Sequence, residues 1–314
     1  MFMPSGLAVF LLMCLLPWGL LAQGLPRAQS PEEVGLSSER LKRLSAMFKS
    51  EIEKGSTPGA VLLVARRGKV AYVEALGARD PQTNDAMKTD AIFRLASMTK
   101  PFVSVAAMML SEEGRLVLSD PVSQYLPEFK GMQVGVEQKS STGELKLVLE
   151  ATHREMTIQD LLRHTAGLTY GQFGVKTLVK TEYDKAGISS PALTSAEFIT
   201  RLSKIPLAHQ PGAVWDYSVA TDVLGRVIEV IAGQDLDTFL RERIARPLRL
   251  GDTGFSVPAA NHGRIAESFV NKATGKRLID RVITEPPKRF GGGGMMVATA
   301  ADYARFCQML LNGG

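Results

Sequence analysis

The sequence predicts an α+β fold, in which a β-hairpin close to the N-terminus precedes a long and mostly helical region. Residues 60–65 (AVLLVA) and 70–75 (VAYVEA) are short apolar runs on either side of Arg67 and Gly68, a pattern typical of a hairpin. Beyond them, apolar residues recur at three- and four-residue steps, which indicates helices. Because two strands alone do not make a stable sheet, we expect further strands or a covering element beside the hairpin.

Composition and charge are those of an ordinary globular protein of one or two domains. Of the 314 residues, 45% are hydrophobic and 22% are charged, which allows a substantial core. The formal net charge is +5, and Arg and Lys are interspersed with Asp and Glu instead of forming blocks. The sequence contains no nucleic-acid-binding motif, internal repeat or low-complexity tract. It therefore predicts no nucleic-acid partner.

The N-terminal segment resembles a secretory signal peptide. Residues 7–16 are almost entirely apolar, and Ala22 offers a small residue for cleavage. The segment predicts a secreted or periplasmic protein and is short for a membrane span. Because it lacks Lys and Arg, an uncleaved membrane anchor is the alternative. If Cys14 leaves with the signal, Cys307 is the only thiol of the mature chain, and no intrachain disulfide can form.

We expect four segments along the chain. Residues 1–22 form the signal peptide, and residues 30–95 form the N-terminal helix and hairpin of an α/β domain. Residues 96–285 form a mostly helical domain. Residues 286–314 return to the α/β domain through a Gly-rich loop and a helix.

The first half of the chain predicts two helices around the hairpin. Leu41, Leu44 and Phe48 follow helical spacing before Gly55, which marks the end of the first helix. The stretch SVAAMMLSEEG after the hairpin predicts a helix that is apolar enough to be buried centrally. Residues 130–152 are polar apart from one alternating patch, so we expect an exposed excursion there.

The second half predicts helices with clear boundaries. A Thr followed three residues later by an acidic residue can form a capping box at the start of a helix. We expect such boxes at Thr157 with Asp160, Thr194 with Glu197, and Thr299 with Asp302. An apolar stripe over residues 223–231 predicts a helix that ends at Gly233. Residues 276–290 predict irregular structure, and residues 299–311 predict the last helix.

Ser97 and Lys100, in FRLASMTKPF, are the first candidate pair for catalysis. A three-residue step on a helix places both side chains on one face. Pro101 belongs in a first turn, so the helix must begin close to Ser97, where free N–H groups favour developing negative charge. A buried lysine can act as the base for a serine hydroxyl. Alone, however, this motif is expected about once by chance in a chain of this length, and Ser97 could simply cap a helix whose Lys100 is solvated.

Tyr217 is the third candidate. In HQPGAVWDYSVATDVLG it follows a Pro-Gly turn and directly precedes the apolar stripe, a position from which a side chain can enter a cleft. Its phenol could relay a proton between Lys100, Ser97 and a leaving group. Alone, a tyrosine at this position is more often an ordinary core or interface aromatic than a catalytic residue.

Together these residues carry a resemblance to the serine β-lactamase superfamily. The segments that resemble the family, in its order and spacing, are SMTK (97–100), DPVSQYLPEF (120–129), LLRHTAGL (161–168), YSV (217–219) and GGGGMMVATAADYARF (291–306). The most similar branch is class C-like and includes family VIII carboxylesterases and low-molecular-weight penicillin-binding enzymes. The resemblance runs from about residue 30 to the last residue. It implies a β-lactamase/transpeptidase-like fold, with an antiparallel sheet flanked by helices and a mostly helical domain.

The resemblance also implies roles for the candidate residues. Ser97 would be the acylated nucleophile, Lys100 its base or proton partner, and Tyr217 the proton relay. Trp215, Ser218 and Val219 would then lie at the substrate, with Trp215 able to line the acyl pocket or merely to pack. The lactamase pattern has Asn where this chain has Val219. Since that Asn helps to hold a β-lactam amide, its absence favours an esterase.

The family's third motif, K-T-G or an H-x-G or W-x-G variant, would lie on a strand beyond the last predicted helix. The sequence ends at LLNGG before such a strand, and neither KAG at 185–187 nor HGR at 262–264 is a suitable substitute. That strand would supply one of two N–H donors to the oxyanion hole, and losing one donor costs about a hundred- to a thousandfold in rate. We therefore expect an incomplete chain whose C-terminal sheet strands are missing.

The predicted function is an exported serine hydrolase that forms an acyl-enzyme at Ser97 from a small-molecule carboxylic ester. A β-lactamase or D-Ala-D-Ala carboxypeptidase is the alternative within the family. A non-catalytic or fragmentary relative that only binds is the alternative from another class. No cofactor is implied, and no metal, since the histidines lack metal-ligand spacing; we expect His164 to orient a loop beside the cleft. The sequence predicts no membrane partner beyond the export signal and says nothing of oligomeric state.

Overall fold

The computed structural model describes residues 24–314. The predicted signal peptide, residues 1–22, and Cys14 lie outside the described residues. Within residues 24–314, none of the helices combines the length and apolar character needed to cross a membrane.

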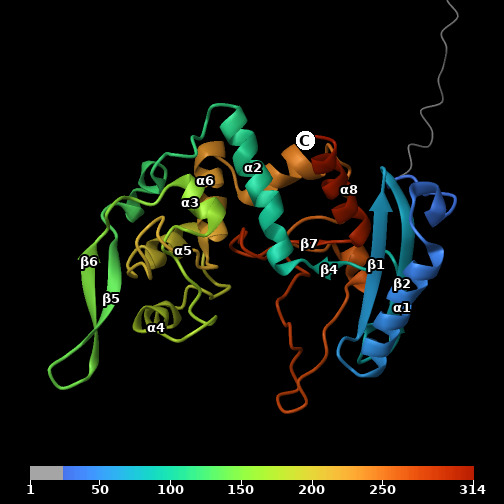
Figure 1. Cartoon of the computed structure of the whole chain (residues 1–314), viewed down its shortest axis with the longest axis horizontal. Helices are drawn as coiled ribbons and strands as arrows, with labels where there is room; N and C mark the ends of the chain where they lie inside the picture. The colour runs from blue at the N-terminus through green and yellow to red at the C-terminus, as the bar shows by residue number, and fades with distance from the viewer. Residues whose placement is uncertain (1–23) are drawn as a thin grey trace, which may run out of the picture.

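The N-terminal part is the predicted helix and hairpin (Figure 1). Helix α1 (Ser38–Glu53) packs on β1 (Gly59–Arg66) and β2 (Lys69–Asp80), which pair antiparallel with Gly59 opposite Gly77. The turn residues Arg67 and Gly68 have φ of 53° and 73°, as a type I′ turn requires. The hairpin prediction is confirmed. A short third strand, β3 (Asp85–Ala86), lies beside β2, and helix α8 (Ala300–Leu311) packs against β1.

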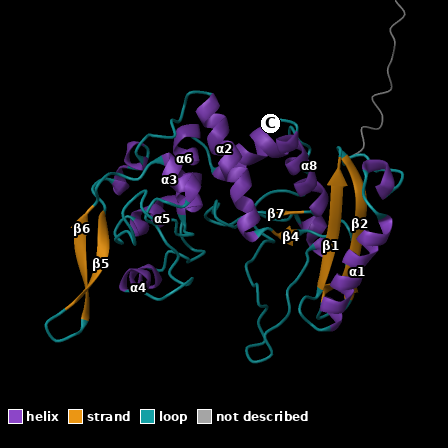
Figure 2. Ribbon diagram, in the orientation of Figure 1, coloured by secondary structure: helices purple, strands orange, loops and turns teal. Residues whose placement is uncertain are grey.

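Three helices form the centre of the molecule (Figures 1 and 2). They are α2 (Lys100–Glu112), α6 (Ala220–Ala232) and α8 (Ala300–Leu311). The apolar face of α2, including Phe102 and Leu110, is completely buried, and the Phe102 ring stacks on Phe306 of α8 with centroids 3.9 Å apart. The central burial of α2 and the α6 stripe ending at a left-handed Gly233 confirm both predictions.

A two-stranded sheet joins the start of α2 to the segment before α8. Strand β4 (Phe93–Arg94) pairs antiparallel with β7 (Val297–Ala298). The Leu95 N–H continues this ladder by donating to the Met296 carbonyl at 2.9 Å. The turn that carries Ser97 is therefore attached directly to the strand that follows the glycine run.

The expected excursion at 130–152 is a regular β-ribbon of β5 (Gln133–Lys139) and β6 (Leu145–Ala151), which projects from one end of the molecule (Figure 1). The sequence did not predict the first strand, β5, because Gly135 interrupts its alternating apolar pattern. A Cβ at Gly135 would lie 2.6 Å from Val179 Cγ2. The missing side chain is therefore what allows the ribbon to pack on α4 (Leu178–Lys185).

The remaining elements are short. They are α3 (Ile158–Arg163), α4 (Leu178–Lys185), α5 (Ser195–Leu202), α7 (Leu236–Leu240), a π-helical turn (Arg241–Ala245) and short 3-10 helices at Pro31–Val34, Val122–Gln124, Pro127–Phe129 and Ala259–Arg264. The capping boxes of α3 and α5 are confirmed. That of α8 is only half right. Thr299 caps the helix, but the Asp302 carboxylate accepts instead from the Asp252 N–H and the Thr253 hydroxyl.

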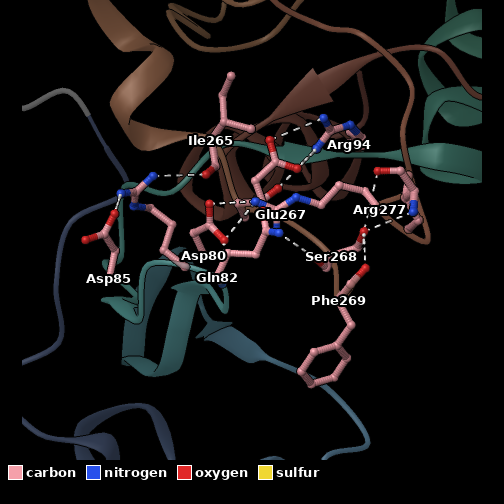
Figure 3. Close-up of polar contacts among 12 residues, drawn as sticks. Asp80, Gln82, Asp85, Arg94, Ile265, Glu267, Ser268, Phe269 and Arg277 are labelled. Carbon is pink, nitrogen blue, oxygen red and sulfur yellow. Dashed lines mark hydrogen bonds and ion pairs between the residues drawn. The ribbon is translucent and has the colours of Figure 1, made fainter. Parts of the chain in front are cut away.

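A polar network fixes the long irregular segment before the glycine run (Figure 3). Arg277 pairs with Asp80 of β2 at 2.7 Å, and Arg94 of β4 pairs with Glu267 at 3.1 Å. The Arg281 guanidinium donates to the Met295 carbonyl at 2.8 Å. Residues 276–290 have no regular structure, as predicted, yet Arg277 ties this loop to β2 and Arg281 ties it to the segment before β7.

The Asp160 carboxylate joins α3 to the segments just before and after it, and its loss should destabilise the protein. The buried carboxylate accepts from Arg154, from the Thr157 N–H and from the Thr165 hydroxyl. Burial alone would raise its pKa, but these donors hold the pKa well below its usual range.

We expect Asp160→Asn to lower the free energy of unfolding by about 3 kcal/mol, because Arg154 loses its buried counter-ion. Chemical denaturation measures this change. Asp235→Asn, at the exposed N-cap of α7, is the control and should cost about 1 kcal/mol or less. Equal losses in the two variants would contradict the assignment.

Candidate active site

Ser97 lies in a 3-10 turn (Ala96–Thr99) that leads straight into α2. The preceding residue, Ala96, has a φ of 46°, a left-handed conformation that is costly for a residue with a Cβ and that collects at functional sites. Pro101 occupies the first turn of α2, as predicted. The Ser97 side chain is consequently exposed at the N-terminal end of a helix whose other face is buried.

The structure brings Ser97, Lys100 and Tyr217 together, although 120 residues separate Ser97 from Tyr217. The Tyr217 hydroxyl donates to Ser97 Oγ at 2.5 Å, and Lys100 Nζ lies 3.4 Å from the same oxygen. Lys100 Nζ also lies 4.6 Å from the centre of the Tyr217 ring. One hydroxyl oxygen thus faces both a phenol and an amine.

Lys100 is held by the glycine run, a contact that sequence reasoning missed. Its Nζ donates to the Gly293 carbonyl at 2.7 Å, and the Gly293 N–H donates to the Asp222 carboxylate at 3.1 Å. Burial raises the pKa of Asp222, while Arg289 nearby partly counteracts that rise. In the sequence, Asp222 is simply an acidic residue in the first turn of α6, with no signal for this role.

The glycine run is explained by its close approach to α6. A Cβ at Gly292 would lie 2.5 Å from the Thr221 carbonyl, and one at Gly293 only 2.2 Å from an Asp222 carboxylate oxygen. Side chains at these positions would push the segment away from α6. Its carbonyl would then move away from Lys100.

His164 positions the segment that carries Tyr217. It has a left-handed φ of 56°, its carbonyl accepts from the Asp216 N–H at 3.0 Å, and its Nδ1 accepts from the Ser218 N–H at 3.3 Å. Its ring lies 4.8 Å from that of Tyr217. Burial and the nearby Lys100 charge lower the pKa of His164, so the neutral ring that the Ser218 contact requires is favoured.

The three residues predicted at the substrate differ in accessibility. Trp215 is 66% exposed, whereas Ser218 and Val219 are only 1% and 6% exposed. The Ser218 hydroxyl caps the turn into α6 by accepting from the Ala220 N–H at 3.3 Å. Of the three, Trp215 alone presents a large accessible side chain.

The fold is that of a β-lactamase-related protein, and the comparisons place the chain in that family. The family model described as Beta-lactamase matches residues 44–314. Because the match covers most of the chain, the protein belongs to the beta-lactamase family.

Curated relatives include esterases and acyltransferases. The chain is 37% identical over 217 residues to esterase EstB of Burkholderia gladioli, a match covering 68% of this chain and 51% of the esterase. It is 35% identical over 276 residues to an uncharacterized protein of Mycobacterium tuberculosis, covering 86% of this chain and 66% of that protein. The chain therefore spans about half to two thirds of the length of these relatives.

Solved structures agree with the fold. EstCE1, described as a hydrolase with promiscuous acyltransferase activity, matches with a TM-score of 0.70 at 28% identity, covering 87% of this chain and 73% of that one. Simvastatin synthase (LovD) from Aspergillus terreus matches with a TM-score of 0.67 at 26% identity, covering 88% and 69%. A class C beta-lactamase at 18% identity and a TM-score of 0.65 shares the fold.

Gly293→Ala and Gly294→Ala form a matched pair that tests the approach of the glycine run to α6. The Cβ added at Gly293 meets Asp222, whereas the nearest atom to one at Gly294 is 3.4 Å away. We expect Gly293→Ala to lower the free energy of unfolding by about 1–3 kcal/mol, as overpacking does, and Gly294→Ala to change it far less. Thermal or chemical denaturation measures both. The reverse order would contradict the packing described here.

His164 should make stability depend on pH. Since its pKa is depressed in the folded protein, the unfolded chain binds the proton first as the pH falls, and stability is lost below about pH 6.5. We expect the melting temperature to fall more between pH 7 and pH 5 in the wild type than in His164→Asn. Asn tolerates the left-handed backbone and does not titrate. The same dependence of melting temperature on pH in the wild type and in His164→Asn would refute this role.

Proposed function

We propose that the protein is a serine hydrolase that forms an acyl-enzyme at Ser97 from a carboxylic ester. The observation that carries the proposal is the convergence of the Tyr217 hydroxyl and the Lys100 amine on Ser97 Oγ, at 2.5 and 3.4 Å. A nucleophile within hydrogen-bond reach of a base that is itself oriented by a third group is the arrangement covalent catalysis needs. Here the Gly293 carbonyl orients Lys100.

The chemistry follows from these positions. Ser97 Oγ attacks the ester carbonyl carbon, and its proton passes to the Lys100 amine, which has first released a proton to solvent. The tetrahedral intermediate then collapses as the Tyr217 hydroxyl gives a proton to the departing alkoxide, which releases the alcohol. Lys100 returns the proton to Tyr217. In the second half, water attacks the acyl carbonyl, gives up a proton through the same two groups, and the acid leaves as Ser97 recovers its hydroxyl.

An ester is favoured over a β-lactam by Val219 and by the relatives. Val219 is buried and apolar, so it offers no amide at the place where the lactamase pattern has Asn. Proteins described as an esterase and as a hydrolase with acyltransferase activity are among those similar to this chain. Relatives described as acyltransferases also support transfer of the acyl group to an acceptor other than water.

A fluorophosphonate probe tests the proposal directly. We expect stoichiometric labelling of the wild type at Ser97, located by peptide mass spectrometry, and none in Ser97→Ala. Lys100→Met and Tyr217→Phe should each slow labelling and ester hydrolysis about a hundredfold or more, as removal of a general acid–base group does.

Ser111→Ala, at the other end of α2, is the matched control and should label like the wild type. A cooperative thermal transition in each sample establishes that the protein is folded. Folded wild type that does not label, or undiminished labelling in Ser97→Ala, would refute the proposal. Faster turnover of a β-lactam than of simple esters would favour the lactamase alternative.

A further inference from the structure

Four aromatic rings form a continuous surface beside Ser97, here called the aromatic surface: Tyr170, Phe173, Trp215 and Tyr217. Tyr217 is at its centre, with Trp215 stacked on one side at 6.3 Å between ring centres and an interplanar angle of 27°. Tyr170 lies on another side at 5.6 Å, and Phe173 meets Tyr170 edge-on at 5.3 Å. The rings come from two loops, one before α4 and one before α6.

The outer two rings are exposed although they are apolar. Trp215 is 66% exposed and Phe173 is 56% exposed. Their neighbours Val214 and Val175 are exposed as well, at 44% and 83%. Single exposed apolar residues are ordinary, but a group of large ones around a reactive side chain marks a binding surface. Large, stiff aromatic side chains are also the ones that contribute most to recognition.

The chemistry at Tyr217 decides which part of the ester meets this surface. Tyr217 Oη lies 2.5 Å from Ser97 Oγ, and in the proposed reaction it protonates the departing alkoxide. The alkoxide oxygen must therefore lie close to the Tyr217 hydroxyl. The alcohol carbons attached to that oxygen are then the substrate atoms next to Tyr217 and to the rings packed around it.

We propose that the aromatic surface binds the alcohol portion of the ester and selects aromatic or bulky apolar alcohols, with Trp215 and Phe173 as the specificity-determining residues. This inference rests on the proposed function, because the roles of Ser97 and Tyr217 in that reaction fix where the acyl portion and the alcohol portion of the ester lie. The acyl portion lies on the other side of the carbonyl carbon. The acyl portion therefore does not contact Trp215 or Phe173.

Two isomeric esters distinguish recognition of the alcohol portion from recognition of the acyl portion. Benzyl acetate carries its ring on the alcohol, and methyl phenylacetate carries it on the acyl group, while their alcohols are of similar acidity. We expect Trp215→Ala and Phe173→Ala each to lower kcat/KM for benzyl acetate about tenfold, the worth of a good aromatic contact. For methyl phenylacetate the change should stay within twofold. Val117→Ala, a truncation of another exposed apolar residue (51% exposed) beyond the far end of α2, should change neither.

Binding without turnover gives a second readout. The sequence has two tryptophans, Trp18 and Trp215. In Ser97→Ala, 4-nitrobenzyl acetate should quench the tryptophan emission saturably, and adding Trp215→Phe should abolish that saturable quenching. Saturable quenching in a protein that hydrolyses no ester would support the aromatic surface while refuting the proposed function. Turnover of both esters with equal sensitivity to Trp215→Ala, or with none, would overturn the inference.

Discussion

Burial of α2 is the constraint on which the rest of the structure depends. Its apolar residues are enclosed by α6, α7 and α8, and Phe102 stacks against Phe306 at 3.9 Å. A helix fixed along its length by close packing cannot rotate or slide without opening cavities. The turn at its N-terminus is consequently fixed as well. Ser97 is exposed, yet the turn that carries it leads directly into this packed helix.

The glycine run couples this helix to α6. Gly292 and Gly293 lie against the first turn of α6 at distances that leave no room for a Cβ. The Gly293 peptide then bridges two helices, because its N–H binds Asp222 of α6 and its carbonyl binds Lys100 of α2. Tyr217 directly precedes α6. The contacts of the Gly293 peptide with Lys100 and Asp222 therefore help to fix the position of Lys100 relative to Tyr217.

Local signals in the sequence predicted most of the helices and the first hairpin, because caps, turns and apolar spacing act within a few residues. The apolar spacing of α6 and the capping boxes of α3 and α5 are local signals of this type. The β5–β6 ribbon and the Asp302 contacts were missed because tertiary packing decides them. In the site, family-like motifs pointed to Ser97, Lys100 and Tyr217. Nothing local marked Asp222 or its contact with Gly293, which joins residues 71 positions apart in the sequence.

The surroundings of Lys100 distinguish it from a structural lysine. Throughout residues 24–314, no carboxylate lies within 4.0 Å of its Nζ. Its contacts are instead the Gly293 carbonyl and the faces of Tyr217 and Tyr170, at 4.6 and 5.9 Å from the ring centres. Dipoles and ring faces orient an amine without committing it to a permanent ion pair. An amine held in this way can exchange a proton with Ser97 during a reaction, which is why the geometry supports acyl transfer rather than a purely structural contact.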